Sequence, residues 1–98
     1  MFSLKITITQ NADEDEIAIH KYISEEFGEI YAKDFQYKLI DLFRIISTNP
    51  FIGWPAKNDQ SLRVYIFSKQ NKIVYKNTNE EIIIIRILNT KTALSKDF

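Results

Sequence analysis

Apolar and polar residues alternate at the start of the chain, and this period of two predicts a half-buried β-strand. Its apolar members are Phe2, Leu4, Ile6 and Ile8. Two longer stretches follow in which apolar residues recur at helical spacing. The first runs from Asn11 to Gly28, a residue suited to ending a helix, and the second from about Glu29 to Ser47. Because almost nothing separates the two stretches, we expect a hairpin of two helices.

The last third of the chain predicts three β-strands separated by short polar breaks. The predicted strands are residues 62–67, 71–76 and 82–89. Such short breaks favour turns, so the three strands should form an antiparallel meander. Residues 49–61 connect the helices to this meander and hold both prolines of the chain. We expect Phe51, Ile52 and Trp54 to anchor this loop onto the core.

The predicted order β-α-α-β-β-β fits a single α+β domain that spans residues 1–98. In this two-layer arrangement the helical hairpin packs on one face of a mostly antiparallel sheet. Period two places one set of side chains of the last strand on one face, namely Ile82, Ile84, Arg86 and Leu88, and the other set on the opposite face, namely Ile83, Ile85, Ile87 and Asn89. Both faces are apolar, so we expect the face without helices to bind a partner.

Composition narrows the function classes. The chain has no cysteine, which excludes disulfides, thiolate metal sites and a cysteine nucleophile, and fits a reducing cytoplasm. No apolar run has the length of a signal-peptide core or of a membrane span. The net charge is zero, but residues 1–49 carry nine acidic and five basic groups and residues 50–98 carry four acidic and eight basic groups. The basic half suggests an anionic partner surface.

The acidic run Asp13 to Glu16 lies at the predicted start of the first helix, where acids interact favourably with the helix dipole. Asn11 is the predicted N-cap, and Glu14 completes a capping box three residues later. Consecutive helical carboxylates point in different directions, so we expect neither paired-acid catalysis nor a metal site. His20 is the only histidine and is expected to face solvent. We therefore predict no metal and no cofactor.

The order of several short motifs resembles that of the RelE/ParE superfamily of toxins from bacterial toxin–antitoxin modules. The matching stretches are Ile23–Phe27 with the second helix, Asn49–Pro55, Leu62–Val64, Lys72–Tyr75 and Ile84–Asn89. Trp54 stands where an arginine is commoner in that family. The resemblance implies a toxin domain and a cognate antitoxin that wraps it with a helix or an added strand, giving a toxin–antitoxin hetero-oligomer.

The family divides by target, since RelE-like members cut messenger RNA on the ribosome and ParE-like members poison DNA gyrase. RNA cleavage without a metal needs a general base, a general acid and cations. The resemblance places such cations at Arg63, Lys72 and Lys91, but lysines replace arginines at the last two positions. Asn89 stands where the family often has histidine, and it cannot transfer protons. The sequence therefore favours a ParE-like gyrase inhibitor that acts by binding, with a RelE-like ribosome-dependent mRNA interferase or an adaptor without toxic activity as alternatives.

The expected partner-binding residues combine exposed apolar groups with a basic fringe that suits an acidic, amphipathic antitoxin segment. They are Trp54, Arg63, Tyr65, Lys72, Tyr75, Arg86, Asn89 and Lys91, with Lys69 and Lys76 as further cations of the fringe. Each type also has a structural alternative. The tryptophan could plug the core, the tyrosines could be ordinary strand residues, and the arginines could pair with a helix carboxylate or a backbone carbonyl.

Overall fold

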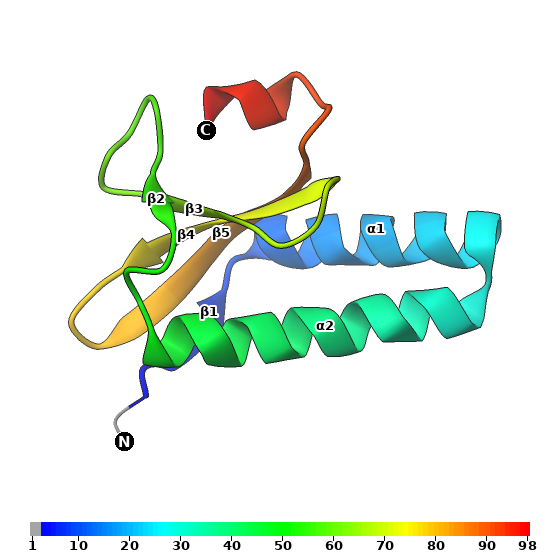
Figure 1. Ribbon diagram of the computed structural model, residues 1–98, viewed down its shortest axis with the longest axis horizontal. Coiled ribbons are helices and arrows are strands. Elements are labelled where there is room, and N and C mark those ends of the chain that lie inside the picture. The colour runs from blue at the N-terminus through cyan, green and yellow to red at the C-terminus, as the bar shows by residue number, and fades with distance from the viewer. Residues whose placement is uncertain (1–2) are drawn as a thin grey trace.

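The computed structural model describes residues 3–98, and within them it contains two α-helices, five strands and one short 3₁₀ helix (Figure 1). The elements are β1 (Lys5–Ile8), α1 (Gln10–Phe27), α2 (Glu29–Thr48), β2 (Trp54–Pro55), β3 (Arg63–Ile66), β4 (Asn71–Asn77), β5 (Glu81–Asn89) and η1 (Leu94–Asp97). The predicted α+β fold, helical hairpin and three-stranded meander are confirmed. Strand β2 and helix η1 were not predicted, and Phe2 lies outside the described residues.

Helix α1 begins directly after β1, and Thr9 is its N-cap. The Thr9 hydroxyl accepts a hydrogen bond from the Ala12 amide at 3.2 Å and donates one to the Ile84 carbonyl at 2.9 Å. The predicted cap at Asn11 is therefore wrong, because Asn11 already lies inside the helix. Gly28 ends α1 as predicted. Its φ of 102° is a backbone angle that residues with a Cβ rarely adopt. One residue thus ends α1 and starts α2.

The sheet has the strand order β1-β5-β4-β3-β2, and only the β1–β5 pair is parallel. Both helices pack on one face, here called the inner face. The buried cluster between the two layers joins residues of both helices to Ile73, Tyr75, Ile82, Ile84 and Ile87 of the central strands. These five side chains are at most 1% exposed. Burial of this apolar layer is the main stabilising contribution to the domain.

A β-bulge interrupts the alternation of side chains along β5. Val74 of β4 faces Arg86, and the next residue Tyr75 faces Ile84, so Ile85 has no partner on β4. The extra residue shifts the pattern by one position. Consequently both Ile84 and Ile87 face the helices, whereas strict alternation had placed them on opposite faces. That part of the prediction is wrong beyond the bulge.

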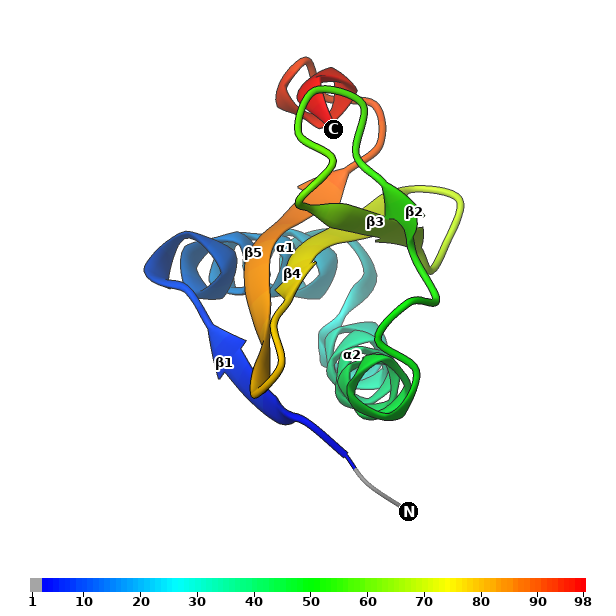
Figure 2. The same ribbon diagram turned by 90° about the vertical axis from the view of Figure 1, so that its left-hand side faces the viewer.

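The opposite side of the sheet, the outer face, is partly covered by the C-terminal segment 90–98. Helix η1 lies on the far side of the strands from α2 (Figures 1 and 2). The Lys72 ammonium donates a hydrogen bond to the Ser95 carbonyl at 2.7 Å, and the Lys57 amide donates one to the Phe98 carbonyl at 3.3 Å. Val74 points outward between Ile73 and Tyr75, yet it is fully buried. The face that we expected to be bare is therefore covered in part, by this segment and not by α1 or α2.

Candidate functional site

The loop between α2 and β3 is held by its main chain. The Tyr75 hydroxyl donates to the Pro50 carbonyl at 2.9 Å and accepts from the Gly53 amide at 3.0 Å. The Arg63 guanidinium donates to the carbonyls of Phe51 and Gly53, and its central carbon lies 5.3 Å from the centre of the Phe51 ring. Apart from the stacking of Arg63 on the Phe51 ring, these contacts hold the loop through its backbone groups.

The apolar side chains of this loop point to solvent. Phe51 is 71% exposed, and Trp54 on β2 is 79% exposed. Ile52 is also exposed. The prediction that the three anchor the loop onto the core is wrong, because Tyr75 and Arg63 hold the loop through backbone groups instead. The result is an exposed tryptophan on a fixed backbone, which is a favourable arrangement for binding a protein partner.

The structure contradicts the prediction that Tyr75 contacts a partner, because this side chain is fully buried and hydrogen-bonded within the loop. Tyr65 lies on the inner face and packs against the core cluster. Tyr75 follows the structural alternative and offers no exposed ring on which a base could stack. Tyr65 is half-buried, and its contact with a partner remains a prediction.

Arg86 forms an ion pair with Asp15 of α1. Its Nε lies 2.7 Å from Oδ2 of Asp15, and a second nitrogen lies 2.8 Å from Oδ1. The same Oδ2 accepts the Ile87 amide at 3.0 Å, so Asp15 also occupies a backbone donor of β5. The hydrogen bonds to Asp15 hold the pKa of Arg86 above its ordinary value. The geometry thus matches the expected pairing with a helix carboxylate, and partner binding by Arg86 remains a prediction.

A cavity of about 390 Å³, here called the outer-face cavity, opens on the outer face between the sheet and the C-terminal segment. Its wall is formed by Trp54, Pro55, Lys57, Val64, Ile66, Lys72, Thr90, Ser95, Lys96 and Phe98. Burial and the charge of Lys57 lower the pKa of Lys72. Of the predicted partner residues, Trp54 and Lys72 therefore share one site. Lys91 and Asn89 lie beyond it, at the exposed end of β5.

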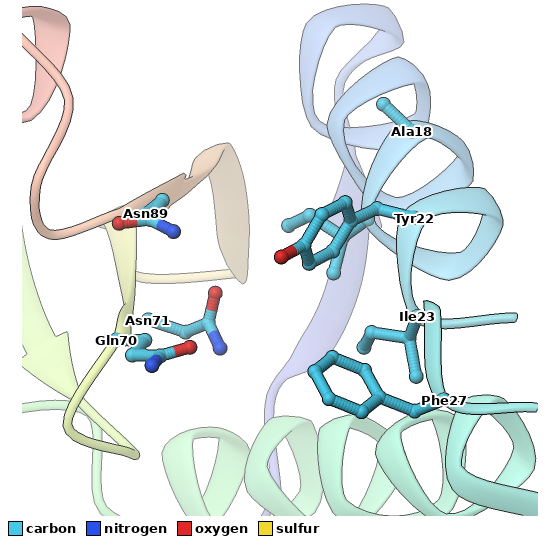
Figure 3. Close-up of a pocket in the computed structure, with 8 residues that line it drawn as sticks. Ala18, Tyr22, Ile23, Phe27, Gln70, Asn71 and Asn89 are labelled. Carbon is cyan, nitrogen blue, oxygen red and sulfur yellow. The ribbon is translucent and has the colours of Figure 1, made fainter. Parts of the chain in front are cut away.

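A second concave region, the α1–β5 groove, runs between helix α1 and the ends of β4 and β5 (Figure 3). This groove has a volume of about 270 Å³, with apolar side chains along one wall and side-chain amides along the other. The apolar wall consists of Ala18, Ile19, Tyr22, Ile23 and Phe27, and the amides are Gln70, Asn71 and Asn89. The sequence predicted only Asn89 here. The residues that reveal this groove are two aromatic side chains of α1 that the structure leaves exposed, Tyr22 at 59% and Phe27 at 61%.

Comparison with known protein families decides the assignment. The family described as ParE toxin of type II toxin-antitoxin system, parDE, matches residues 6–94 of the chain. The chain belongs to this ParE toxin family. A ParE toxin of a type II system has a cognate antitoxin as its partner, so the coarse function predicted from the sequence is confirmed.

Solved structures with this fold include proteins described as ParE and as YoeB toxins. The chromosomal ParDE system from P. aeruginosa is 18% identical, with a TM-score of 0.76 over 89% of this chain and 96% of that chain. The YoeB dimer from Staphylococcus aureus is 20% identical, with a TM-score of 0.62 over 88% and 95%. A YoeB/ParE toxin from Agrobacterium tumefaciens is 15% identical, with a TM-score of 0.60 over 88% and 98%. The comparison with curated proteins gave no match.

The three cations suggested for an RNA-cleaving member of the superfamily are not gathered in this ParE-family chain. In the strand register Arg63 lies opposite Tyr75, and both side chains point to the inner face. Lys72 lies opposite Leu88, and both of these side chains point to the outer face. Lys91 follows β5 and is exposed. Because Arg63 also binds two loop carbonyls, it cannot join Lys72 at one phosphate without a rearrangement of the loop.

Two further absences concern residues 3–98. Within this range no three His, Asp or Glu side chains lie close enough to hold a metal ion together. Nor does any helix of this range combine the length and the apolar character that crossing a membrane requires.

Glu16 of this ParE-family chain lies in a small cavity between α1 and α2 that is also lined by Asp13, Ile17, His20 and Gln36. His20 is partly buried there, with 28% of its side chain exposed, so the prediction that it faces solvent is wrong. Burial raises the pKa of Glu16 above 4.5, the nearby Asp13 raises it further, and His20 lowers it. The ionised carboxylate is thus disfavoured in the folded state.

Replacing Glu16 by glutamine is expected to raise the melting temperature at neutral pH. A carboxyl with a raised folded pKa stabilises the fold below its unfolded pKa, and that contribution is lost as the pH rises through the folded pKa. The difference between Glu16→Gln and the parent should therefore vanish well below pH 4.5. Thermal melts across this pH range test the expectation, with the exposed Glu26→Gln as the matched control. An equal shift for both variants would contradict it.

Proposed function

We propose that this chain is a toxin that arrests growth by binding DNA gyrase, that it acts without catalysis, and that its cognate antitoxin neutralises it in the cytoplasm. The observation that carries the proposal is the separation of Arg63 and Lys72 onto opposite faces of the sheet. The RNA-cleaving alternative needs both cations at one phosphate. A binding mode needs only an accessible and well-held surface, which the loop around Trp54 supplies.

Metal-free RNA cleavage also requires a general base and a general acid within hydrogen-bond reach of the reacting oxygens. The only histidine of the chain, His20, lies on α1 between the two helices. Tyr75, the last tyrosine, is fully buried in the core. Asn89 at the end of β5 has no titratable group and accepts the Lys91 amide with its side-chain oxygen at 2.8 Å. These positions favour a toxin that binds its target over one that cleaves it.

One observation favours the alternative of a ribosome-dependent mRNA interferase. Burial and the charge of Lys57 lower the pKa of Lys72, and this shift favours the neutral amine that a general base requires. Lys57 and Lys96 line the same cavity and could hold a phosphate. This alternative therefore places the reaction at the outer-face cavity, without Arg63.

Gyrase supercoiling and ribosome-bound mRNA cleavage, measured with the same purified protein, separate the two targets. We expect inhibition of supercoiling and intact mRNA. Trp54→Ala should weaken the inhibition about tenfold, since exposed tryptophans often dominate protein interfaces. The control is Tyr37→Ala, which removes a comparably exposed aromatic ring, 68% exposed, from the outside of α2. Both variants should keep the parental melting temperature.

Other outcomes would contradict the proposal in different ways. Cleavage of mRNA on ribosomes that is lost in Lys72→Met would support the interferase. Unhindered growth of cells that express the chain without an antitoxin would support an adaptor without toxic activity.

A further inference from the structure

The α1–β5 groove has two walls of different chemistry that face the same space (Figure 3). The helix wall carries the rings of Tyr22 and Phe27, whose centroids lie 6.3 Å apart with an angle of 75° between their planes. The two rings thus form a corner, in which a flat molecule can stack on one ring and contact the edge of the other. The opposite wall carries the side-chain amides of Gln70, Asn71 and Asn89. A ligand that matches both walls must have an aromatic face and a polar edge.

The amide wall keeps hydrogen-bonding groups free for such a ligand. Among residues 3–98, Gln70 makes its hydrogen bonds through its backbone, since its nitrogen donates to the Ser68 hydroxyl at 3.3 Å and its carbonyl accepts from Thr90 at 2.8 Å. Its side-chain amide therefore offers a donor and an acceptor side by side. The Asn71 nitrogen donates to the same hydroxyl at 3.2 Å, and the Asn89 oxygen accepts a main-chain amide at 2.8 Å. Asn71 thus retains its oxygen and Asn89 its nitrogen.

Two lysines flank the amide wall. Lys69 precedes Gln70 in the chain, and Lys91 follows Asn89 after one residue. The two segments lie side by side, because the Thr90 hydroxyl donates to the Lys69 carbonyl at 3.1 Å. Both lysines are exposed, and the ion pairs within residues 3–98 involve other cations. An anionic group on the ligand would therefore find positive charge near the amides.

We propose that the α1–β5 groove binds an adenine nucleotide. The base stacks in the corner formed by Tyr22 and Phe27, and its polar edge binds the side-chain amide of Gln70. The phosphate lies toward Lys69 and Lys91. Adenine is the base whose N6 and N7 pair with a glutamine or asparagine amide in bidentate geometry, and aromatic side chains commonly hold unpaired bases by stacking. The groove shares no lining residue with the outer-face cavity, so this site goes beyond the proposed toxin function and does not depend on it.

The size of the groove favours one ring system over a segment of a protein. Its volume of about 270 Å³ lies just below the range of about 300–1,000 Å³ that pockets for drug-sized ligands occupy. An apolar side chain would cover the two rings but leave the three amides of the opposite wall without partners, and an amide removed from water without a hydrogen bond is unfavourable. A nucleobase satisfies both walls at once.

Isothermal titration calorimetry with AMP tests the site. We expect saturable binding that is weaker for adenosine, which lacks the phosphate. Binding should be about tenfold weaker for IMP, in which an oxygen replaces the N6 amino group, because a mismatched bidentate contact has an effect of that order. Tyr22→Leu should weaken AMP binding about tenfold, since it removes the stacking ring but keeps an apolar side chain. Gln70→Ala should abolish the preference for AMP over IMP while stacking remains.

Tyr37→Leu and Gln60→Ala are the matched controls. They make similar changes at exposed positions that do not line the groove, and they should leave the affinity for AMP unaltered. Tyr22 and Gln70 are exposed as well, so all four variants should keep the parental melting temperature.

A short oligoadenylate forms the second arm of the titration, because the same base could come from a free nucleotide or from a strand. Equal affinity per base supports the free nucleotide, and binding of the oligoadenylate alone would assign the same base chemistry to a strand. Three results would overturn the proposed site, namely no saturable binding of either ligand, equal affinities for AMP and IMP, or equal effects of Tyr22→Leu and Tyr37→Leu. These titrations contain no gyrase, so a protein that ignores AMP but inhibits gyrase would overturn this site alone. A protein that binds AMP but spares gyrase would overturn only the proposed target.

Discussion

Replacing Gly53 by alanine is expected to lower the free energy of unfolding by about 3 kcal/mol, the upper part of the range for overpacked interiors. A Cβ at this position would lie 2.7 Å from the Val64 carbonyl oxygen and 3.0 Å from two atoms of the Tyr75 ring and hydroxyl. The Val64 carbonyl belongs to strand β3, and Tyr75 is fully buried, so neither can retreat at low cost. The loop must move instead, which breaks the bond between the Gly53 amide and Tyr75. Urea unfolding monitored by circular dichroism measures the loss.

Tyr75→Phe is the companion variant, because it removes the same hydrogen bonds without adding an atom. It should cost roughly 1–2 kcal/mol, the lower part of the range for a buried donor left without a partner. Ile52→Ala, in the same loop but exposed, should change the midpoint little. A midpoint for Gly53→Ala equal to that of Ile52→Ala would show that the loop is not held as described. If the loop moves, Trp54 moves with it, so Gly53→Ala should also weaken the inhibition of gyrase that we propose.

Much of the fold could be predicted from the sequence because its elements have distinct periods. Two amphipathic stretches separated by Gly28 can form little other than a helical hairpin, since glycine alone accepts its φ of 102° without strain. The strands were equally clear, and β5 was predicted within one residue of its observed limits, Glu81–Asn89. Periodicity, however, contains no information about which strands become neighbours. The parallel β1–β5 pair, which joins the first and the last strand of the chain, emerged only from the structure.

The parts of the fold that the sequence did not predict depend on single local contacts. The bulge at Ile85 changes which side chains face the helices, and nothing in a run of four isoleucines marks its position. The observed N-cap is Thr9 and not the predicted Asn11. The Thr9 hydroxyl also donates a hydrogen bond to the carbonyl of Ile84, which is far away in the sequence. The C-terminal segment lacks a period, yet it returns to the outer face of the sheet, where the Ser95 carbonyl accepts a hydrogen bond from Lys72.

The sequence predicted the residue types of the candidate site better than their positions in the fold. Exposed Trp54 and basic Lys72 do share a cavity, as a partner surface of apolar and basic groups requires. Lys57 and Lys96 were missed, because only the tertiary fold brings the loop after β2 and helix η1 next to β4. Tyr75 was misplaced because a strand tyrosine is equally common inside and outside a sheet. Its neighbours Val74 and Ile73 are both buried, so local sequence could not decide its face.

This comparison bears on the target as well. A superfamily motif such as leucine–arginine in a strand specifies a residue type, but the face of the sheet is set by the register. In this chain the register turns Arg63 toward the loop of Gly53 and turns Lys72 toward the outer-face cavity. The same two residue types could cooperate at one phosphate only if they lay on one face. The inference of a binding toxin therefore depends on the register and not on the presence of the cations.

Replacing Asp15 by alanine is expected to lower the free energy of unfolding by about 2–3 kcal/mol, near the lower end of the range for breaking a buried ion pair. The pair lies near the surface, since 15% of the Asp15 and 25% of the Arg86 side chain is exposed, so solvent moderates the loss. Two partners would be left behind, namely the Arg86 guanidinium and the Ile87 amide at the edge of β5. An unpaired amide at a strand edge adds to the cost of the unpaired charge.

Asp34→Ala is the matched control, because it breaks an ion pair of similar length, 3.0 Å to Lys38, on the exposed side of α2. Surface pairs of this kind contribute less than about 1 kcal/mol, so its midpoint should stay near that of the parent in thermal and urea unfolding. If Asp15→Ala proved as mild as Asp34→Ala, Arg86 would not depend on α1. Its guanidinium would then be free for a partner, as the sequence had suggested, and Arg86→Ala should reduce antitoxin affinity without changing stability. If Asp15→Ala is costly as expected, Arg86 holds helix α1 to β5, and we expect contacts with the antitoxin and with the proposed gyrase target to come from residues such as Trp54.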